Sequence, residues 1–503
     1  MNIRLAWRQR LTALRKGLPA GFLVIPLLFF GINNIERGKE TESRVFELMD
    51  EVRRLESAPL WPGFEPAAIP VALFDGQNTY LFNFPDQPKG FLPIEGRDRV
   101  LLLKGQHPSV VGNRPIQIKG IWVATSIPQT FSPVTKKKYT SAEMAAVIIH
   151  EKFHVFQALR HPDWRPNDTA LFDYPPDTEE SMVLKKMEIE ATKRAVLAER
   201  DEDAAGWARS ALNIRRQRLA GLPDRHAVYE RQLQRLEGLA EYIQYEAGGR
   251  GILDGPPISG IAPNAAREMG YLEGRWNANL LDRLDPGWKD RMEAGEFLYL
   301  EERLETVLRD GPNLRVFSFE ELCGIWEDAA AVLRNKEKER EELAKDFYSR
   351  LGTYVEFIAD ENPLHLEMFD PFTIEAIEAG KMIHKQWLVL KNENGTAEVF
   401  NTLCLTEVND RVQVIRLVIA GISKRNPLVQ WPGHVALTQD GITAVFKNAK
   451  VSGRGNRFYV YLRIPETGGH DQPTEKESLS TACSSSACFS GPGHSAGEKI
   501  RRH

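Results

Sequence analysis

Two imidazoles and a carboxylate occur within five consecutive residues, His150-Glu151-Lys152-Phe153-His154. In a helix, residues four apart differ by about 40° and 6 Å of rise, so both histidines would project from one face and could share a metal ion. Zinc with three protein ligands keeps one position open and lowers the pKa of a bound water to about 7. Glu151 would lie beside that face and accept the proton as the water attacks a carbonyl group. The pattern therefore indicates zinc-assisted hydrolysis.

A third zinc ligand must come from elsewhere in the chain. Glu237 begins the sequence E-G-L-A-E-Y inside a predicted helix. A glycine within a helix costs about 1 kcal/mol relative to alanine, so Gly238 suggests a close approach of this helix to another helix or to a metal. Glu188 and Glu190 are the alternatives. We favour Glu237, because Gly238 and Ala240 would allow its helix to approach the zinc helix closely.

The H-E-x-x-H sequence followed by E-G-x-A-x-Y resembles the gluzincin metallopeptidases of the thermolysin-like superfamily, especially their aminopeptidase N-like and glycyl-aminopeptidase branches. The resemblance covers roughly residues 116–284. It implies one zinc ion with three protein ligands, namely His150, His154 and Glu237. It also implies that Glu151 is the general base. Glu241 falls one helical turn after Glu237, where a second carboxylate could accept the proton of a ligand histidine and fix the ring.

Further residues carry parts of the same resemblance. A Y-x-x-G sequence begins at Tyr271 and resembles that of the aminopeptidase N-like branch, in which the tyrosine hydroxyl stabilises the tetrahedral oxyanion. The alternatives are core packing for Tyr271, or the same role for Tyr242 or Tyr245. Asp173 lies at the shorter spacing that those branches use for the third ligand. Residues 121–126 could form the edge strand along which an extended peptide pairs.

The helix that must carry the two histidines has recognisable ends. Thr140 followed by Glu143 predicts a capping box at its start, and Pro162 predicts that it stops before that proline. Apolar periodicity predicts further helices along the centre of the chain, at about 177–215, 226–246, 265–284, 295–309 and 319–350. These helices would supply the remaining side chains of the site.

Short β-rich runs lie on both sides of this helical region. Near the N-terminus they flank Asp75-Gly76, a hairpin signal. From Trp387 onward apolar residues follow the period of strands, with Asn394-Gly395 as a turn. The sequence therefore predicts an α+β protein with a small N-terminal β-containing subdomain, a helical zincin-like core and a separate C-terminal β-rich module.

Five segments follow from these patterns. We expect a signal-like or anchor segment, a mixed α/β subdomain, a zinc metallopeptidase core, a β-rich module and a disordered tail, at residues 1–35, 36–139, 140–370, 371–465 and 466–503. The tail is rich in Ser, Gly and Pro and has no apolar period, so it cannot bury a core of its own.

Composition limits the possible partners. The chain has 503 residues, of which 42% are hydrophobic, and so can bury at least one large core. Its 65 basic and 69 acidic residues give a net charge of −4, so there is no basic excess to neutralise a phosphate backbone. Four cysteines are too few for a disulfide scaffold. Nucleic acid is therefore not expected as a partner.

The N-terminal segment has the order of a secretory signal. Basic residues precede an apolar run from Leu18 to Ile32, and the first acidic residue is Glu36. The run is short of the ~20 residues of a membrane span, and no small-residue cleavage site follows it. We expect an uncleaved anchor, membrane association and a location in the cell envelope or outside the cell. The alternative is an apolar helix in a cytoplasmic protein.

The function predicted from these residues is zinc-dependent hydrolysis of a peptide or protein substrate. The main alternative is a catalytically inactive gluzincin-like scaffold that acts as a binding or envelope-assembly protein. Glu151-x-x-His154 is also the motif of di-iron helical bundles, in which Glu188, Glu190 and Glu237 could supply further carboxylates. Such sites need a second Glu-x-x-His, which the sequence lacks.

Overall fold

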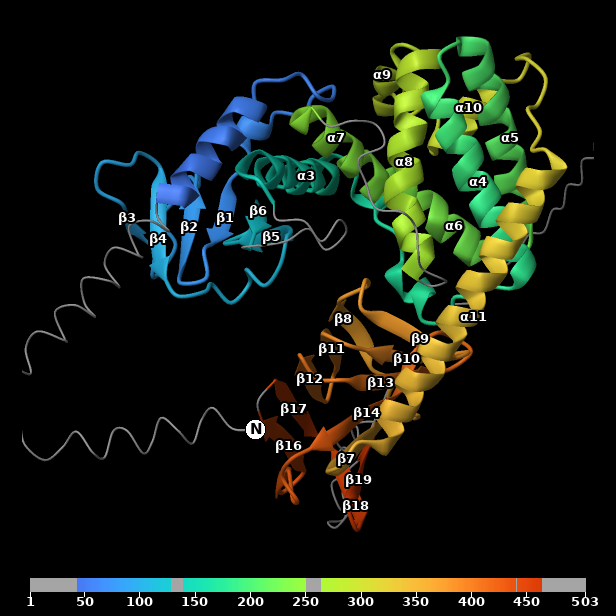
Figure 1. Cartoon of the computed structure of the whole chain (residues 1–503). Helices are drawn as coiled ribbons and strands as arrows, with labels where there is room; N and C mark the ends of the chain where they lie inside the picture. The colour runs from blue at the N-terminus through green and yellow to red at the C-terminus, as the bar shows by residue number, and fades with distance from the viewer. Residues whose placement is uncertain (1–42, 128–138, 250–263, 440, 464–503) are drawn as a thin grey trace, which may run out of the picture. The chain divides into compact units, whose positions relative to one another are not determined.

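A computed structural model of the chain describes residues 43–127, 139–249, 264–439 and 441–463. The described residues form a sheet near the N-terminus, a series of helices in the centre and two further sheets (Figure 1). The predicted α+β class, with a helical core followed by a β-rich region, is confirmed. The anchor segment predicted at residues 1–35 and the tail predicted at 466–503 lie outside the described residues.

The N-terminal sheet has six strands in the order β3-β4-β2-β1-β6-β5. They are β1 (Val71–Phe74), β2 (Asn78–Phe82), β3 (Leu92–Pro93), β4 (Val100–Lys104), β5 (Arg114–Ile118) and β6 (Ile121–Ser126). The predicted hairpin joins β1 to β2: Gly76 has a φ of 97°, and the Asp75 carboxylate accepts two backbone hydrogen bonds of 2.7 Å from residues 77 and 78. This local signal was therefore sufficient to place the turn.

The prediction that residues 121–126 form an edge strand is wrong. β6 pairs with β1 in parallel and with β5 in antiparallel orientation, so it lies inside the sheet. Lys119 and Gly120, with φ values of 50° and 78°, reverse the chain between β5 and β6. The edge strand beside β6 is thus β5.

Helix α3 (Ser141–Arg160) carries the H-E-x-x-H residues and begins at the predicted capping box. The Glu143 backbone N–H donates to Thr140 Oγ1 at 3.2 Å, and the Thr140 N–H donates to Glu143 Oε2 at 2.7 Å. Lys152, within the motif, is buried and donates from Nζ to the carbonyl oxygens of Pro66 and Ile69, both at 2.9 Å. These bonds fix α3 to the segment that precedes β1.

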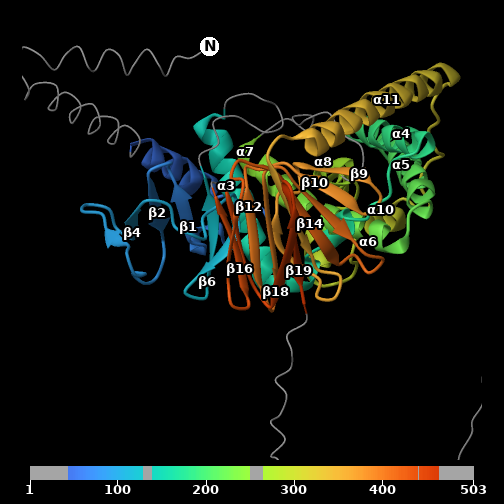
Figure 2. The same ribbon diagram turned by 90° about the horizontal axis from the view of Figure 1, so that it is seen from below.

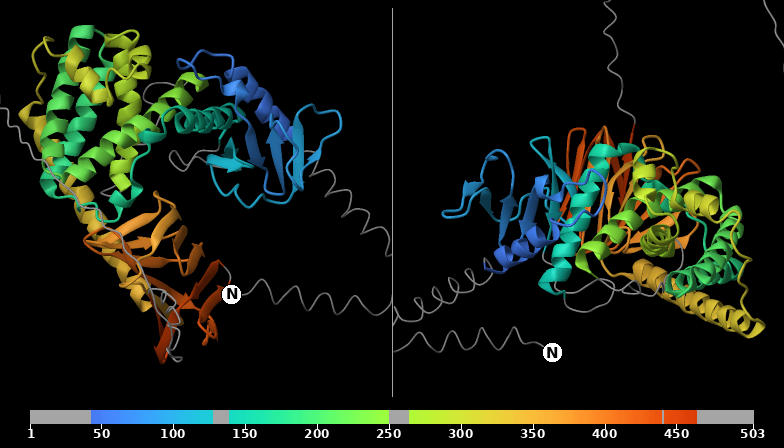
Figure 3. Two further views of the ribbon diagram at one scale, coloured as in Figure 1. Left: turned by 180° about the vertical axis from the view of Figure 1, so that it is seen from behind. Right: turned by 90° about the horizontal axis from the view of Figure 1, so that it is seen from above.

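The central helices follow α3 along the chain. They are α4 (Glu179–Leu197), α5 (Asp201–Ala220), α6 (Asp224–Leu233), the π turn η4 (Gln234–Gly238), α7 (Leu239–Gly248), α8 (Asn264–Leu284), α9 (Trp288–Glu293), α10 (Leu300–Val307) and α11 (Phe319–Ser349). α7 packs against α3, and α11 packs against α4 (Figures 2 and 3). Within the described residues, no helix is both long and apolar enough to cross a membrane.

The single helix predicted at about 177–215 is two helices in the structure, α4 and α5, which pack against each other. The chain turns between them at residues 198–200. Arg283 of α8 donates hydrogen bonds to the carbonyl oxygens of Ala198 and Glu199, at 2.5 and 3.0 Å. A contact from a distant helix thus stabilises a break that the apolar period did not predict.

The C-terminal strands form two sheets, with the orders β18-β19-β7-β14-β13-β10-β9 and β15-β16-β17-β12-β11-β8. Their bounds are β7 (Thr353–Ile358), β8 (His365–Phe369), β9 (Ile374–Glu378), β10 (Lys381–His384), β11 (Trp387–Asn392), β12 (Gly395–Phe400), β13 (Cys404–Val408), β14 (Val414–Ile422), β15 (Leu428–Trp431), β16 (His434–Gln439), β17 (Ile442–Lys447), β18 (Ala449–Arg454) and β19 (Arg457–Leu462). Two of these strands, β7 and β8, precede residue 371, where we expected the module to begin.

Candidate metal centre

The two histidines of α3 lie on one face of the helix. Their ring centroids are 4.6 Å apart, with the ring planes at 80°. Both side chains are at least nine-tenths buried, with 8% exposure for His150 and 10% for His154. The helical spacing of the motif therefore brings the imidazoles together as expected.

Glu237 reaches these histidines from the π turn η4. Its Oε2 lies 3.1 Å from His154 Nε2 and 3.8 Å from His150 Nε2. One donor atom from each of the three residues lies within 4.8 Å of the other two. π turns occur frequently at functional sites, because the extra residue changes the direction of a side chain. The carboxylate favoured by the sequence is thus the one that meets the histidines.

Gly238 does allow a close helix approach, but to α8 rather than to α3. A Cβ atom at Gly238 would lie 2.5 Å from Gly274 Cα and 2.7 Å from the carbonyl oxygen of Gly270. The expectation that this glycine brings its helix close to α3 is therefore wrong. The Y-x-x-G sequence contributes to the same contact, because Gly274 is its last residue.

The other carboxylates considered as the third ligand bind to different side chains. Glu188 accepts hydrogen bonds from Arg215 and Arg218 inside the helical core. Glu190 pairs with Arg194 at 2.9 Å on the same helix. Asp173 accepts from His226, with an Oδ1 to Nε2 distance of 3.1 Å, and pairs with Arg225. None of these three carboxylates belongs to the buried His-His-Glu group among the described residues.

Glu151 is buried, and its Oε2 has no hydrogen-bond partner among the described residues. Burial raises the pKa of its carboxyl to about 8, although the neighbouring His154 opposes the shift. A divalent cation beside this carboxyl would favour its charged form. Without a metal ion, burial thus favours the protonated form of this carboxyl at pH 7.

The two histidines differ in their electrostatic surroundings. Burial lowers the pKa of His150 to about 4, so its ring is neutral at pH 7, the form that binds metals. Burial acts in the same direction on His154, but the Glu237 carboxylate outweighs it and raises the pKa of His154 to about 9. His154 Nδ1 donates to Gln157 Oε1 at 2.7 Å, a contact that orients the ring.

Glu241 lies near the second nitrogen of His150, as the resemblance implies. The distance from its Oε2 to His150 Nδ1 is 3.8 Å, longer than a hydrogen bond. His150 Nδ1 has no hydrogen-bond partner within the described part of the chain. The structure therefore places Glu241 near His150 but does not form the predicted hydrogen bond between them.

Tyr271 lies on α8 beside the histidines. Its ring is nearly parallel to that of His150, at 9°, with centroids 6.2 Å apart. Burial and the negative charge of Glu237 raise the pKa of Tyr271 well above its ordinary value, so its hydroxyl remains a donor. The alternatives lie elsewhere: Tyr242 donates to Asp282 at 2.6 Å, and the Tyr245 ring stacks under the guanidinium of Arg275 at 3.7 Å.

The sequence reasoning missed Arg267, which contacts the proposed third ligand. Its Nη2 donates to Glu237 Oε1 at 2.7 Å, and its Nη1 lies 3.3 Å from Asp168 Oδ1. Arg267 is buried and lies four residues before Tyr271 on α8, so the two share a helix face. That spacing is the signal that could have identified it.

The residues present suit a zinc ion. Two imidazoles and one carboxylate form the donor set of one class of catalytic zinc sites, which leave a fourth position open. Glu151 follows His150 in the chain, and its Oε2 has no hydrogen-bond partner among the described residues, so it could accept a proton from a water bound to the ion. The chain matches no protein-family model, and it matches neither a curated protein nor a solved structure. The site must therefore be interpreted from its own geometry.

Proposed function

We propose that this chain is a zinc-dependent peptidase. The observation that supports the proposal is the buried convergence of His150, His154 and Glu237 beside Glu151. Three nitrogen and oxygen donors with a carboxylate of raised pKa form a set suited to hydrolysis by activated water. Peptide bonds are the substrate implied by the resemblance of the H-E-x-x-H and E-G-x-A-x-Y sequences to gluzincins.

Each residue has a separate task in this proposal. His150, His154 and Glu237 would hold the ion. When bound, the ion would polarise the substrate carbonyl and lower the pKa of a bound water. Glu151 Oε2 has no hydrogen-bond partner among the described residues and would accept the proton of the attacking water. The same carboxyl would then return that proton to the leaving amine. The Tyr271 hydroxyl would donate to the oxyanion.

Zinc content and hydrolysis of an unfolded protein together test this function. We expect about one zinc ion per purified chain, measured by elemental analysis, and cleavage of reduced casein that stops with a chelator and returns with added zinc. Zinc binding without cleavage of casein or of a peptide library would favour the inactive scaffold. Absence of zinc binding would contradict the proposal.

Tyr271→Phe tests the proposed oxyanion donor. Because this change removes one hydroxyl only, we expect folding, zinc content and KM to persist while kcat falls by about 10²–10³-fold, the usual loss for one such donor. Steady-state cleavage of a fluorogenic peptide would measure it.

Tyr242→Phe is the matched control, since that hydroxyl donates to Asp282, which is outside the His150, His154 and Glu237 group. Its kcat should remain within a few fold of the unmodified protein's. An unchanged kcat in folded, zinc-loaded Tyr271→Phe would assign Tyr271 to packing alone.

A further inference from the structure

The π turn that carries Glu237 is held from several sides. Arg235 donates to the carbonyl oxygens of Asp163 and Leu298, and Gln157 donates to the carbonyl of Leu236 at 2.9 Å. A π turn is less regular than an α-helical turn and usually occurs singly, so it needs tertiary contacts to persist. Its first residue, Gln234, contacts α8.

Gln234 lies against α8 through both its backbone and its side chain. A Cβ atom at Gly274 would lie 2.5 Å from the Gln234 carbonyl oxygen, so glycine is required there. Gln234 Nε2 donates to Glu273 Oε2 at 2.9 Å, and both side chains are buried, with 3% and 1% exposure. Asn277 Nδ2 lies 3.4 Å from Gln234 Oε1. The side-chain amide is thus bonded at both ends.

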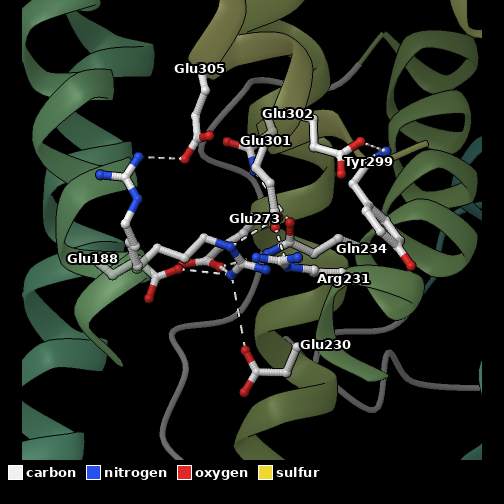
Figure 4. Close-up of polar contacts among 12 residues, drawn as sticks. Glu188, Glu230, Arg231, Gln234, Glu273, Tyr299, Glu301, Glu302 and Glu305 are labelled. Atoms are coloured by element: carbon white, nitrogen blue, oxygen red, sulfur yellow. Dashed lines mark hydrogen bonds and ion pairs between the residues drawn. The ribbon is translucent and has the colours of Figure 1, made fainter. Parts of the chain in front are cut away.

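Glu273 is itself anchored in a buried network of charges. Arg215 Nη1 contacts Glu273 at 3.2 Å and Glu188 at 2.9 Å, and Arg215 Nε contacts Glu301 at 3.0 Å. Figure 4 shows the three glutamates converging from different helices, with Gln234 alongside. The three come from α8, α4 and α10. A network with this many mutual contacts holds Glu273 in one place.

A role in stability alone does not account for this arrangement. Buried ion networks are weak contributors to stability, because desolvation of the charges offsets their attraction. They do fix relative positions of the groups that they join. Here the network joins four helices, because Arg215 lies on α5 and the three glutamates lie on α4, α8 and α10. One further hydrogen bond connects it to the turn whose fourth residue is Glu237.

We propose that Gln234 and Glu273 are positioning residues for the metal centre: their buried hydrogen bond fixes the π turn so that Glu237 presents Oε2 to both histidines. The inference rests on the proposed function, in which Glu237 is the third zinc ligand. The residues act through Glu237, since the described contacts of Gln234 and Glu273 include neither His150 nor His154.

The test compares zinc affinity among four variants in the full chain. Gln234→Met and Glu273→Leu remove the hydrogen bond, and we expect each to weaken zinc binding by about 10–100-fold, the usual effect of losing a group behind a ligand. Glu273→Gln keeps an oxygen that can accept from Gln234 and should retain affinity within about threefold. Glu301→Gln weakens the same network at Arg215 and also at Arg231 of α6, but Glu301 has no described hydrogen bond to the turn itself, so this variant should also retain affinity.

Competition with a chromophoric chelator gives the dissociation constants, and thermal unfolding in EDTA reports folding without metal. The expected pattern separates zinc affinity from stability: Glu301→Gln removes one charge from a buried ion pair and should lower the Tm, because the remaining charge is left uncompensated, but it should not weaken zinc binding. Wild-type affinity in folded Gln234→Met would overturn the positioning role alone. Equal losses of affinity in Gln234→Met and Glu301→Gln would overturn it as well. Absence of zinc binding in the unmodified chain would contradict the proposed function, and the positioning role with it.

Discussion

Glu151→Gln is expected to keep one zinc ion per chain while its rate of peptide hydrolysis falls by about 10²–10⁴-fold, the usual contribution of a positioned acid–base group. The amide has the shape of the carboxylate but cannot accept the proton of the attacking water. Zinc remains because Glu151 is not in the His150, His154 and Glu237 group. Elemental analysis and kcat for a fluorogenic peptide measure the two effects.

The zinc-free fold provides a control for this variant. Burial raises the pKa of Glu151 to about 8, so the folded protein disfavours its charge, and a neutral amide should not destabilise it. Thermal unfolding in EDTA should therefore give the variant a Tm no lower than that of the unmodified chain. Hydrolysis at the original rate in zinc-loaded Glu151→Gln would show that Glu151 is not the general base.

Local patterns were enough to predict helix α3 and its start. The capping box of Thr140 and Glu143 depends on residues three apart, and the shared face of His150 and His154 depends on residues four apart. Both relations are built into an α-helix. The Asp75-Gly76 hairpin was predictable for the same reason. Features set within one turn of chain therefore followed from the sequence.

Features set by distant contacts did not follow. The break between α4 and α5 involves Arg283 from another helix, and the interior position of β6 depends on its pairing with β1. Gly238 signalled a close approach without identifying α8 as the neighbour. The π turn itself has no local signature, since its hydrogen-bond shift depends on what packs around it. The spacing from Tyr271 placed Arg267 on the same helix face, but its contact with Glu237 comes from a distant part of the chain, so the sequence did not assign it to the site.

The third zinc ligand can be tested by comparing substitutions of Glu237 and Glu190, two of the carboxylates that the sequence alone left as alternatives. Glu237→Ala is expected to weaken zinc binding by more than the 10–100-fold typical of groups behind a ligand, because it removes a donor atom itself. Glu190→Ala should leave zinc affinity unchanged, since Glu190 pairs with Arg194 on α4. Chelator competition at constant pH measures both dissociation constants.

A second substitution is needed because Glu237 also neutralises Arg267, with 2.7 Å between Oε1 and Nη2. Removing one partner of a buried ion pair costs about 3–5 kcal/mol, so Glu237→Ala could lose zinc by losing its fold. Glu237→Gln keeps an oxygen that can accept from Arg267 while removing the anionic ligand. We expect it to fold in EDTA and still bind zinc far more weakly than the unmodified chain. Equal affinity in folded Glu237→Gln, or a larger loss in Glu190→Ala, would mean that a different carboxylate completes the site.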